Sequence, residues 1–180
     1  MVADPASEIL YTPEQISARV CQLGRQISDD YTGQELLIVG ILKGAFVFLA
    51  DLIRAVSVPL EIDFVAISSY GASTRTSGVV RIIKDLEQSV EGKHVLIVED
   101  IIDTGLTLKL SYLVENLKSR KASSVKICTL LDKPSRRETD IRADYVGFVI
   151  PDRYVIGYGL DYRGLYRNLP FVGVLREEIV

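Results

Sequence analysis

Val95 to Thr107 reads VLIVEDIIDTGLT, and this stretch carries most of the information about the fold. Its four leading residues are apolar, which predicts a buried strand from His94 to Glu99. Beyond a short loop, apolar residues recur with helical spacing from Leu106 to Leu117, which predicts a helix. A strand, a short loop and a helix in this order are typical of an α/β fold.

The preceding segment has the same order. Glu35 to Leu42 reads ELLIVGIL, a continuous apolar run typical of a strand buried on both faces, and Ala45 to Val56 is long enough for a helix. An earlier amphipathic helix is expected after Thr12 and Pro13, which give an N-cap and a first-turn proline. Further strands are expected over residues 60–70, 79–84, 125–131, 145–150 and 154–158. We therefore expect a single α/β domain over residues 1–180 with a mainly parallel sheet, in which ligands bind beside the carboxyl ends of the strands.

Composition excludes several classes of protein. The chain has 180 residues, with 21 Lys and Arg against 24 Asp and Glu, so its formal charge is −3. A slightly acidic chain lacks the basic excess of a protein that binds nucleic acid through phosphate contacts, so no nucleic-acid partner is expected. No export signal is expected from the residues at the N-terminus, and no apolar run in the sequence is long enough to span a membrane. With only Cys21 and Cys128 as thiols, a cytoplasmic protein with free cysteines is expected.

The loop after the 94–99 strand can support two kinds of binding. Thr104 and Thr107 supply hydroxyls, Gly105 allows the backbone to turn closely around an anion, and helix N-terminal amides point outward. This combination suits a phosphate monoester. Glu99 and Asp100 offer oxygen acceptors suited to sugar hydroxyls or to a hydrated Mg²⁺. The plainer alternative is an acidic strand end followed by an ordinary helix start.

The same stretch resembles the phosphoribosyl pyrophosphate (PRPP) loop of type I phosphoribosyltransferases, in the form found in hypoxanthine-guanine phosphoribosyltransferases. The resemblance implies a mainly parallel sheet flanked by helices, with a mobile hairpin loop and a small base-binding hood. Six further segments match that family in the same order: Leu42-Lys43-Gly44, Ser69-Tyr70-Gly71, Leu131-Asp132-Lys133, Pro151-Asp152-Arg153-Tyr154-Val155, Gly157-Tyr158 and Leu160-Asp161-Tyr162.

The resemblance implies roles for the residues that would bind PRPP. Glu99 and Asp100 would hold the ribose diol and its Mg²⁺, and Asp161 would be a second Mg²⁺ ligand. The 5′-phosphate would be wrapped by Asp103, Thr104, Gly105, Leu106 and Thr107. The family often has lysine after the glycine, whereas Leu106 stands there in this chain, which removes one possible charge near the phosphate.

The resemblance also implies a pyrophosphate site. Leu42, Lys43 and Gly44 would form it, with a non-proline cis peptide between Leu42 and Lys43, and Arg167 would be its distal arginine. Taken alone, Lys43-Gly44 could be a plain strand-to-helix turn. Asp161 and Arg167 could likewise be solvated surface charges.

The chemistry of the base completes the expected site. A 6-oxopurine presents an acceptor at O6 and a proton at N7, so its site needs one donor and one acceptor. By resemblance, Lys133 would donate to O6, Asp103 would face N7 and act as the general base, Tyr154 would stack on the ring, and the Val155 carbonyl would read the Watson-Crick edge. Tyr154 alone could equally be a half-buried strand aromatic. Adenine would place an amino donor against Lys133, leaving a buried donor unpaired at a cost of about 1 to 3 kcal/mol.

The expected reaction is purine salvage: transfer of the phosphoribosyl group from PRPP to N9 of hypoxanthine or guanine, with Mg²⁺, giving the nucleoside 5′-monophosphate and pyrophosphate. Ser69, Tyr70 and the loop after them would close over the site and exclude water. Two alternatives stay open, namely a PRPP-binding regulatory protein and a phosphoribosyltransferase that prefers xanthine. Because relatives commonly form dimers or tetramers, a homodimer or homotetramer is expected.

Overall fold

The computed structural model describes residues 5–70, 79–134 and 141–179. For Ser69, Tyr70, Val79, Ile179 and residues 104–107, it describes the backbone alone. The expected mobile loop after Tyr70 therefore lies outside the described residues.

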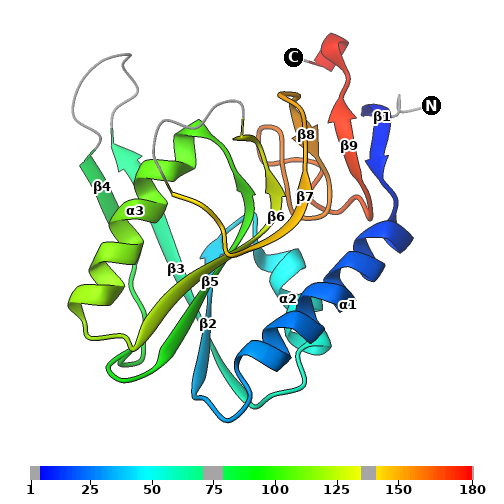
Figure 1. The fold of residues 1–180 in the computed structure, drawn as a ribbon. Coiled ribbons are helices and arrows are strands. Elements are labelled where there is room, and N and C mark those ends of the chain that lie inside the picture. The colour runs from blue at the N-terminus through cyan, green and yellow to red at the C-terminus, as the bar shows by residue number, and fades with distance from the viewer. Residues whose placement is uncertain (1–4, 71–78, 135–140, 180) are drawn as a thin grey trace.

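Six strands form the main sheet, in the order β4-β3-β2-β5-β6-β7. Neighbouring strands are parallel, except that β4 runs antiparallel to β3 (Figure 1). The mainly parallel α/β architecture predicted from the sequence is thus confirmed. The strands are β2 (Leu36–Leu42), β3 (Leu60–Tyr70), β4 (Val79–Lys84), β5 (His94–Ile102), β6 (Ser124–Asp132) and β7 (Tyr145–Val149).

Helices cover both faces of this sheet, which explains the continuous apolar runs of its central strands. Helices α1 (Pro13–Asp30) and α2 (Phe46–Ala55) pack on one face, and α3 (Thr104–Ser119) packs on the other. Along β5, Leu96 and Val98 belong to the α1–α2 core, whereas Val95 and Ile97 belong to the α3 core. Alternate side chains of a strand point to opposite faces, so a strand covered on both sides must be apolar at every position.

Helix α1 begins as its sequence predicts. The Thr12 hydroxyl accepts from the Gln15 amide, and the Gln15 side chain accepts from the Thr12 amide, a reciprocal capping box. The helix then buries one face, which closes the α1–α2 side of the core. That face consists of Ile16, Val20, Leu23, Gly24, Ile27 and Ser28.

A second, antiparallel sheet of three short strands lies beside the main one, in the order β1-β9-β8 (Figure 1). Its members are β1 (Ala6–Tyr11), β8 (Val155–Ile156) and β9 (Val172–Leu175), and a 3-10 helix, η2 (Glu177–Ile179), follows. The sequence did not predict β1 or β9. The strand predicted over residues 154–158 is wrong beyond two residues, because Gly157 and Tyr158 have φ values of 93° and 51°, which turn the chain out of the sheet.

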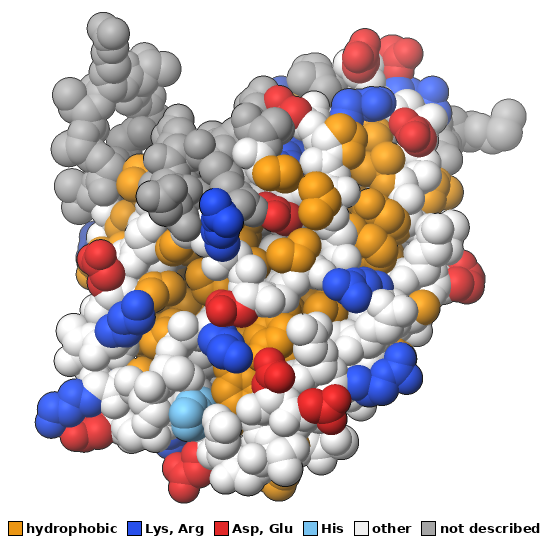
Figure 2. All heavy atoms as spheres, in the orientation of Figure 1, with side chains coloured by type: hydrophobic (Ala, Val, Ile, Leu, Met, Phe, Trp, Pro, Cys, Tyr) orange, Lys and Arg blue, Asp and Glu red, His pale blue; other side chains and the backbone are white. Residues whose placement is uncertain are grey.

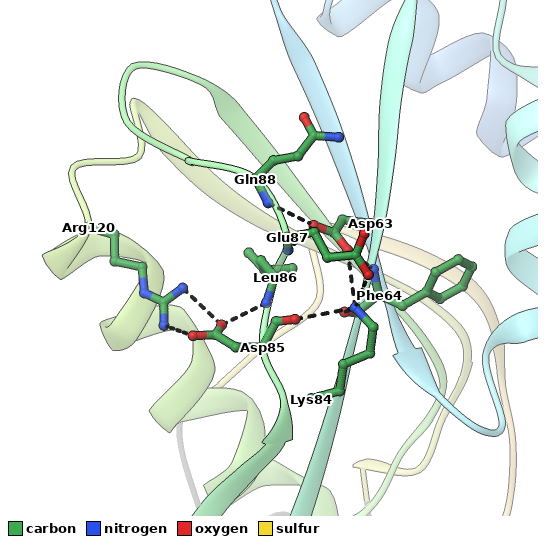
Figure 3. Close-up of polar contacts among 8 residues, drawn as sticks. All are labelled: Asp63, Phe64, Lys84, Asp85, Leu86, Glu87, Gln88 and Arg120. Atoms are coloured by element: carbon green, nitrogen blue, oxygen red, sulfur yellow. Dashed lines mark hydrogen bonds and ion pairs between the residues drawn. The ribbon is translucent and has the colours of Figure 1, made fainter.

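The buried carboxylate of Asp63 binds the connection between β4 and β5 through hydrogen bonds (Figure 3). Asp63 of β3 is 5% exposed and accepts hydrogen bonds from the backbone amides of Glu87 and Gln88 at 2.7 and 3.3 Å. The ammonium of Lys84 lies 3.6 Å from the same carboxylate. Because a buried carboxylate is costly unless its oxygens are paired, these partners account for an acid in the middle of a strand.

The described part of the surface mixes both signs of charge, as the face in Figure 2 shows. None of the helices in the described ranges is long and apolar enough to cross a membrane. Among the described cysteines, Cys21 is exposed, Cys128 is buried and both are free.

Candidate active site

A cavity of about 550 Å³ opens where β2, β5 and β6 end, and β8 closes it from the side of the small sheet. It lies at the carboxyl ends of parallel strands, as the sequence predicts for this class of fold. Charged side chains dominate its lining. Its lining residues include Lys43, Gly44, Glu99, Asp100, Asp103, Lys109, Lys133, Tyr154, Val155, Asp161 and Arg167.

Two buried carboxyl groups lie side by side at the end of β5. Glu99 and Asp100 are 3% and 6% exposed, and they are close enough to interact through a hydrogen bond. Burial raises the pKa of Glu99 well above its usual value, the charge of Asp100 raises it further, and the charge of Lys109 acts in the opposite direction. Burial also raises the pKa of Asp100. Glu99 Oε2 is buried without a hydrogen-bond partner, so this pair is suited to a donor or a cation brought by a ligand.

The loop between β2 and α2 packs directly against this pair. The Leu42-Lys43 peptide bond is cis, and residues 43–45 form a turn that leads into α2. A β-carbon on Gly44 would overlap the Asp100 carboxylate, and one on Gly159 would overlap the Gly44 carbonyl oxygen. The absence of side chains at these two glycines therefore allows three segments to stack.

Asp161 and Arg167 hold each other at the rim of the cavity. Arg167 Nη2 lies 2.6 Å from Asp161 Oδ1, and Arg167 Nη1 donates to the Gly159 carbonyl at 2.6 Å. Asp161 Oδ2 accepts from the Gly164 amide at 2.7 Å. Both side chains are partly buried, so neither is the solvated surface charge that the sequence left open.

Lys133, Tyr154 and Val155 also line the cavity. Lys133 follows β6 and is 8% exposed, and no hydrogen bond or ion pair joins its ammonium to another residue that the structure describes. Tyr154 is 53% exposed, lies directly before β8, and packs edge-on against Tyr162 with 5.5 Å between the ring centroids.

The pairing of β8 determines where the Val155 carbonyl points. The Leu175 amide donates to the Tyr154 carbonyl, and β8 is the edge strand of its sheet. Successive residues of an antiparallel strand alternate in the side to which their N–H and C=O groups point. The carbonyl of Val155 therefore points away from β9 and remains available at the free edge, where the residue lines the cavity.

Asp103 also lines the cavity, and its charge contributes, after burial and the charges of Asp161 and Tyr162, to a raised pKa of Tyr154. The predicted phosphate-binding residues Thr104, Gly105, Leu106 and Thr107 form the first turn of α3, and their side chains lie outside the described part of the chain. The same holds for the side chains of Ser69 and Tyr70 in β3.

Sequence reasoning missed Lys109, which lines the cavity from α3. Lys109 comes three residues after Leu106 in the predicted helix, and residues three apart are neighbours on a helix surface. This spacing could have indicated that Lys109 lies near the predicted phosphate loop. The predicted metal ligands Glu99, Asp100 and Asp161 all line the cavity. Across the described ranges, however, no three His, Cys, Asp or Glu side chains gather closely enough to hold an ion by themselves.

Comparison with known proteins agrees with this geometry. Residues 6–163 match the model of the phosphoribosyl transferase domain family. The chain is 53% identical to the hypoxanthine-guanine phosphoribosyltransferase of Bacillus subtilis, over 99% of this chain and 98% of that protein. The chain belongs to the hypoxanthine-guanine phosphoribosyltransferase family.

Solved structures of this family have the same fold. A hypoxanthine phosphoribosyltransferase from Staphylococcus aureus superposes with a TM-score of 0.92 at 50% identity, covering 99% of this chain and 98% of that one. A variant of the Trypanosoma cruzi hypoxanthine phosphoribosyltransferase, in a ternary substrates complex, superposes with a TM-score of 0.91 at 44% identity, covering 97% and 98%. The type I phosphoribosyltransferase fold expected from the sequence is thereby confirmed.

Proposed function

We propose that this hypoxanthine-guanine phosphoribosyltransferase uses the cavity to transfer the 5-phosphoribosyl group of PRPP to N9 of hypoxanthine or guanine. The observation that carries the assignment of roles is the placement, in one cavity, of a buried acidic pair, a buried lysine and an arginine-aspartate pair. These groups suit a sugar diol, a purine O6 and a pyrophosphate. The reaction makes a nucleoside 5′-monophosphate by salvage of a free base.

The PRPP side of the cavity is assigned to the strand ends that carry the acids and the cis peptide. Glu99 and Asp100 accept from the ribose hydroxyls, and the first turn of α3 directs its amides toward the 5′-phosphate. Leu42, Lys43 and Gly44 form the pyrophosphate site with Arg167. Arg167 reaches pyrophosphate by leaving Asp161, its partner in this structure.

The base side is assigned to the wall formed by Lys133, Tyr154 and Val155. The ammonium of Lys133 donates to O6, the Tyr154 ring stacks on the purine, and the Val155 carbonyl accepts from the Watson-Crick edge. Adenine offers an amino group where Lys133 needs an acceptor, so a buried donor would stay unpaired, at a cost of about 1 to 3 kcal/mol. The site therefore favours 6-oxopurines.

In the chemical step, N9 forms a bond to C1 of the ribose while the bond from C1 to the pyrophosphate oxygen breaks. The electron pair leaves with pyrophosphate, and the proton on N7 passes to Asp103 as general base. Lys43 and Arg167 stabilise the negative charge that develops on the leaving group. Asp103 lies close enough to Tyr154 to act on it electrostatically, which supports its placement beside the base.

The donor set fits Mg²⁺. Glu99, Asp100 and Asp161 supply hard oxygen ligands, and Glu99 Oε2 is buried without a partner. These three residues would hold the ion together with substrate oxygens and water. Bound there, Mg²⁺ would neutralise charge on the pyrophosphate.

A PRPP-binding regulator and a xanthine-preferring transferase are the competing proposals. The experiment supplies PRPP and Mg²⁺ with hypoxanthine, guanine, xanthine, adenine or uracil, and measures nucleotide and pyrophosphate. We expect equal amounts of both products with hypoxanthine and guanine, and little with adenine. PRPP binding without product from any base would favour the regulator, and product mainly with xanthine would favour the second alternative. Loss of turnover on chelation, restored by Mg²⁺, would support the metal assignment.

Assembly into a homodimer or homotetramer is part of the same proposal and rests on the family. Sedimentation of the purified chain at several concentrations distinguishes the two from a monomer.

A further inference from the structure

Lys109 is a charged residue of the cavity to which neither the sequence nor the proposed mechanism gives a role. It lies on α3, five residues after Thr104, the first residue of that helix. It is partly buried and lines the same cavity as Asp103 and Glu99. No hydrogen bond or ion pair joins its ammonium to another residue that the structure describes, so its charge is available to a ligand.

Helix geometry allows this ammonium to reach the beginning of α3. Five residues span about 7.5 Å along a helix axis at about 1.5 Å per residue. Helical side chains lean toward the N-terminus, and lysine carries its charge on a flexible four-carbon stem. The ammonium can therefore lie beside the first turn, where the backbone amides of residues 104–107 attract an anion.

A phosphate at this position would be bound more tightly with such a charge nearby. Leu106 supplies none, and Lys109, three residues later, lies on a neighbouring part of the helix surface. Lys109 is also close enough to Glu99 to act on it electrostatically, which places the ammonium on the PRPP side of the cavity. Lys43 and Arg167, by contrast, belong to the β2–α2 loop and to the segment after β8.

We propose that Lys109 is a PRPP-binding residue that pairs with the 5′-phosphate and supplies the charge that Leu106 does not. This inference rests on the proposed function, because it assumes that the first turn of α3 receives the 5′-phosphate. It predicts that Lys109 distinguishes the two phosphate sites. Ligands that carry the sugar phosphate depend on it, and pyrophosphate does not.

The test uses calorimetric titration of the full chain with ribose 5-phosphate, with Mg²⁺ and pyrophosphate, and with PRPP. Lys109→Gln should weaken ribose 5-phosphate and PRPP binding roughly 10-fold to 100-fold, the effect of losing a hydrogen bond to a charged group. Its affinity for pyrophosphate should match that of the wild type. In the assay, KM for PRPP should rise while kcat at saturating PRPP stays close to the wild-type value.

Two further variants separate the effect of losing the Lys109 charge from an effect on folding. Lys109→Arg keeps the charge and should retain most of the affinity for ribose 5-phosphate. Lys118→Gln removes an exposed lysine from the last turn of the same helix and should change neither affinity. Thermal unfolding of all three variants shows whether a loss of binding reflects a loss of fold.

Wild-type affinity for ribose 5-phosphate in Lys109→Gln would overturn the inference, as would an equal loss of ribose 5-phosphate and pyrophosphate binding. If only the role of Lys109 is wrong, the wild-type protein still makes nucleotide from PRPP and a 6-oxopurine. Failure of the proposed function would instead appear as a wild type that makes no nucleotide with any base.

Discussion

The carboxylate of Asp100 lies so close to the α-carbon of Gly44 that a β-carbon on this glycine would overlap Asp100 Oδ2. Asp100 follows Glu99 after the apolar run of β5, and Gly44 follows the cis peptide at the end of β2. This contact fixes the acidic pair against the proposed pyrophosphate loop. The two halves of the PRPP site are thus positioned by direct packing.

Gly44→Ala should therefore damage catalysis more than folding. The new methyl group must displace either the carboxylate or the loop, and a misplacement of about 1 Å at a reacting centre can cost roughly 100-fold in rate. We expect kcat/KM for PRPP to fall by about that factor. Gly33→Ala is the control: its added β-carbon would meet nothing within 4 Å, but its φ is 74°. It should cost about 1 kcal/mol of stability and leave kcat/KM unchanged. Full activity in Gly44→Ala would show that this contact positions nothing.

Glu99→Gln should make the free protein more stable while impairing PRPP binding. Burial and the charge of Asp100 raise the pKa of Glu99 in the folded state, so the folded protein binds more protons than the unfolded chain. Its ionisation thus costs stability at neutral pH, and wild-type stability should rise as pH falls from 8 toward 5.

The check is thermal unfolding of wild type and Glu99→Gln across this pH range. The variant should unfold at a higher temperature at pH 8, and the difference should shrink toward pH 5. Glu115→Gln, at an exposed position on α3, is the control and should show no such pH dependence. A variant less stable than wild type at pH 8 would contradict the electrostatic account.

Asp63→Asn tests the anchor of the β4–β5 connection (Figure 3). Burial raises the pKa of Asp63, but hydrogen bonds from three backbone amides and the charge of Lys84 outweigh it, so the folded-state pKa is lowered. A lowered pKa gives stability that is present above the unfolded-state pKa and is lost as pH falls through the folded-state value. We expect the variant to lose about 1 to 3 kcal/mol of unfolding free energy at pH 7.

Urea denaturation at pH 7 and at pH 3 measures both effects, and the difference between wild type and variant should narrow at the lower pH. Asp85→Asn is the control, because the side chains of Asp85 and Arg120 are partly exposed to solvent and their pair should contribute less than the buried Asp63 carboxylate does. A larger loss in Asp85→Asn than in Asp63→Asn would refute the anchoring role.

Lys133→Ala should separate the base site from the PRPP site. Loss of the donor to O6 should weaken hypoxanthine binding roughly 10-fold to 100-fold. PRPP affinity should stay the same, because the Lys133 ammonium is assigned to the base, and the contact of this residue with the end of β5 is made by its backbone amide, which alanine keeps. Lys126→Ala removes a lysine of β6, whose ammonium packs over Tyr31 and Tyr145, and should lower stability without changing either affinity. Calorimetry on both variants decides, and a collapse of PRPP affinity in Lys133→Ala would reverse the assignment.

Local signals predicted the elements that define the main sheet. The apolar runs of β2 and β5 end at Lys43 and Glu99 because the strands there meet the cavity, and both ends could be read from the order of residues. The strands β1 and β9 could not be predicted in this way. Their pairing joins Ala6 to Leu175, so neither is a strand without a partner at the opposite end of the chain.

The roles of single charges were also beyond the sequence. Asp161 and Arg167 are six residues apart in the sequence, and only the turn made by residues 157–164 brings their side chains into contact. Gly44 is an ordinary glycine in the sequence, and its packing against Asp100 depends on the neighbouring strands β2 and β5. Tertiary contacts, rather than local propensity, determine these features.

The general base is the most direct test of the proposed mechanism. Asn at position 103 keeps the shape of the side chain but cannot accept the N7 proton, so the chemical step should slow by about 10² to 10⁴. The measurement is single-turnover nucleotide formation by Asp103→Asn, with PRPP titrated into the same preparation. The proposed mechanism predicts a slow single turnover at wild-type PRPP affinity, and a turnover rate close to that of the wild type would contradict it.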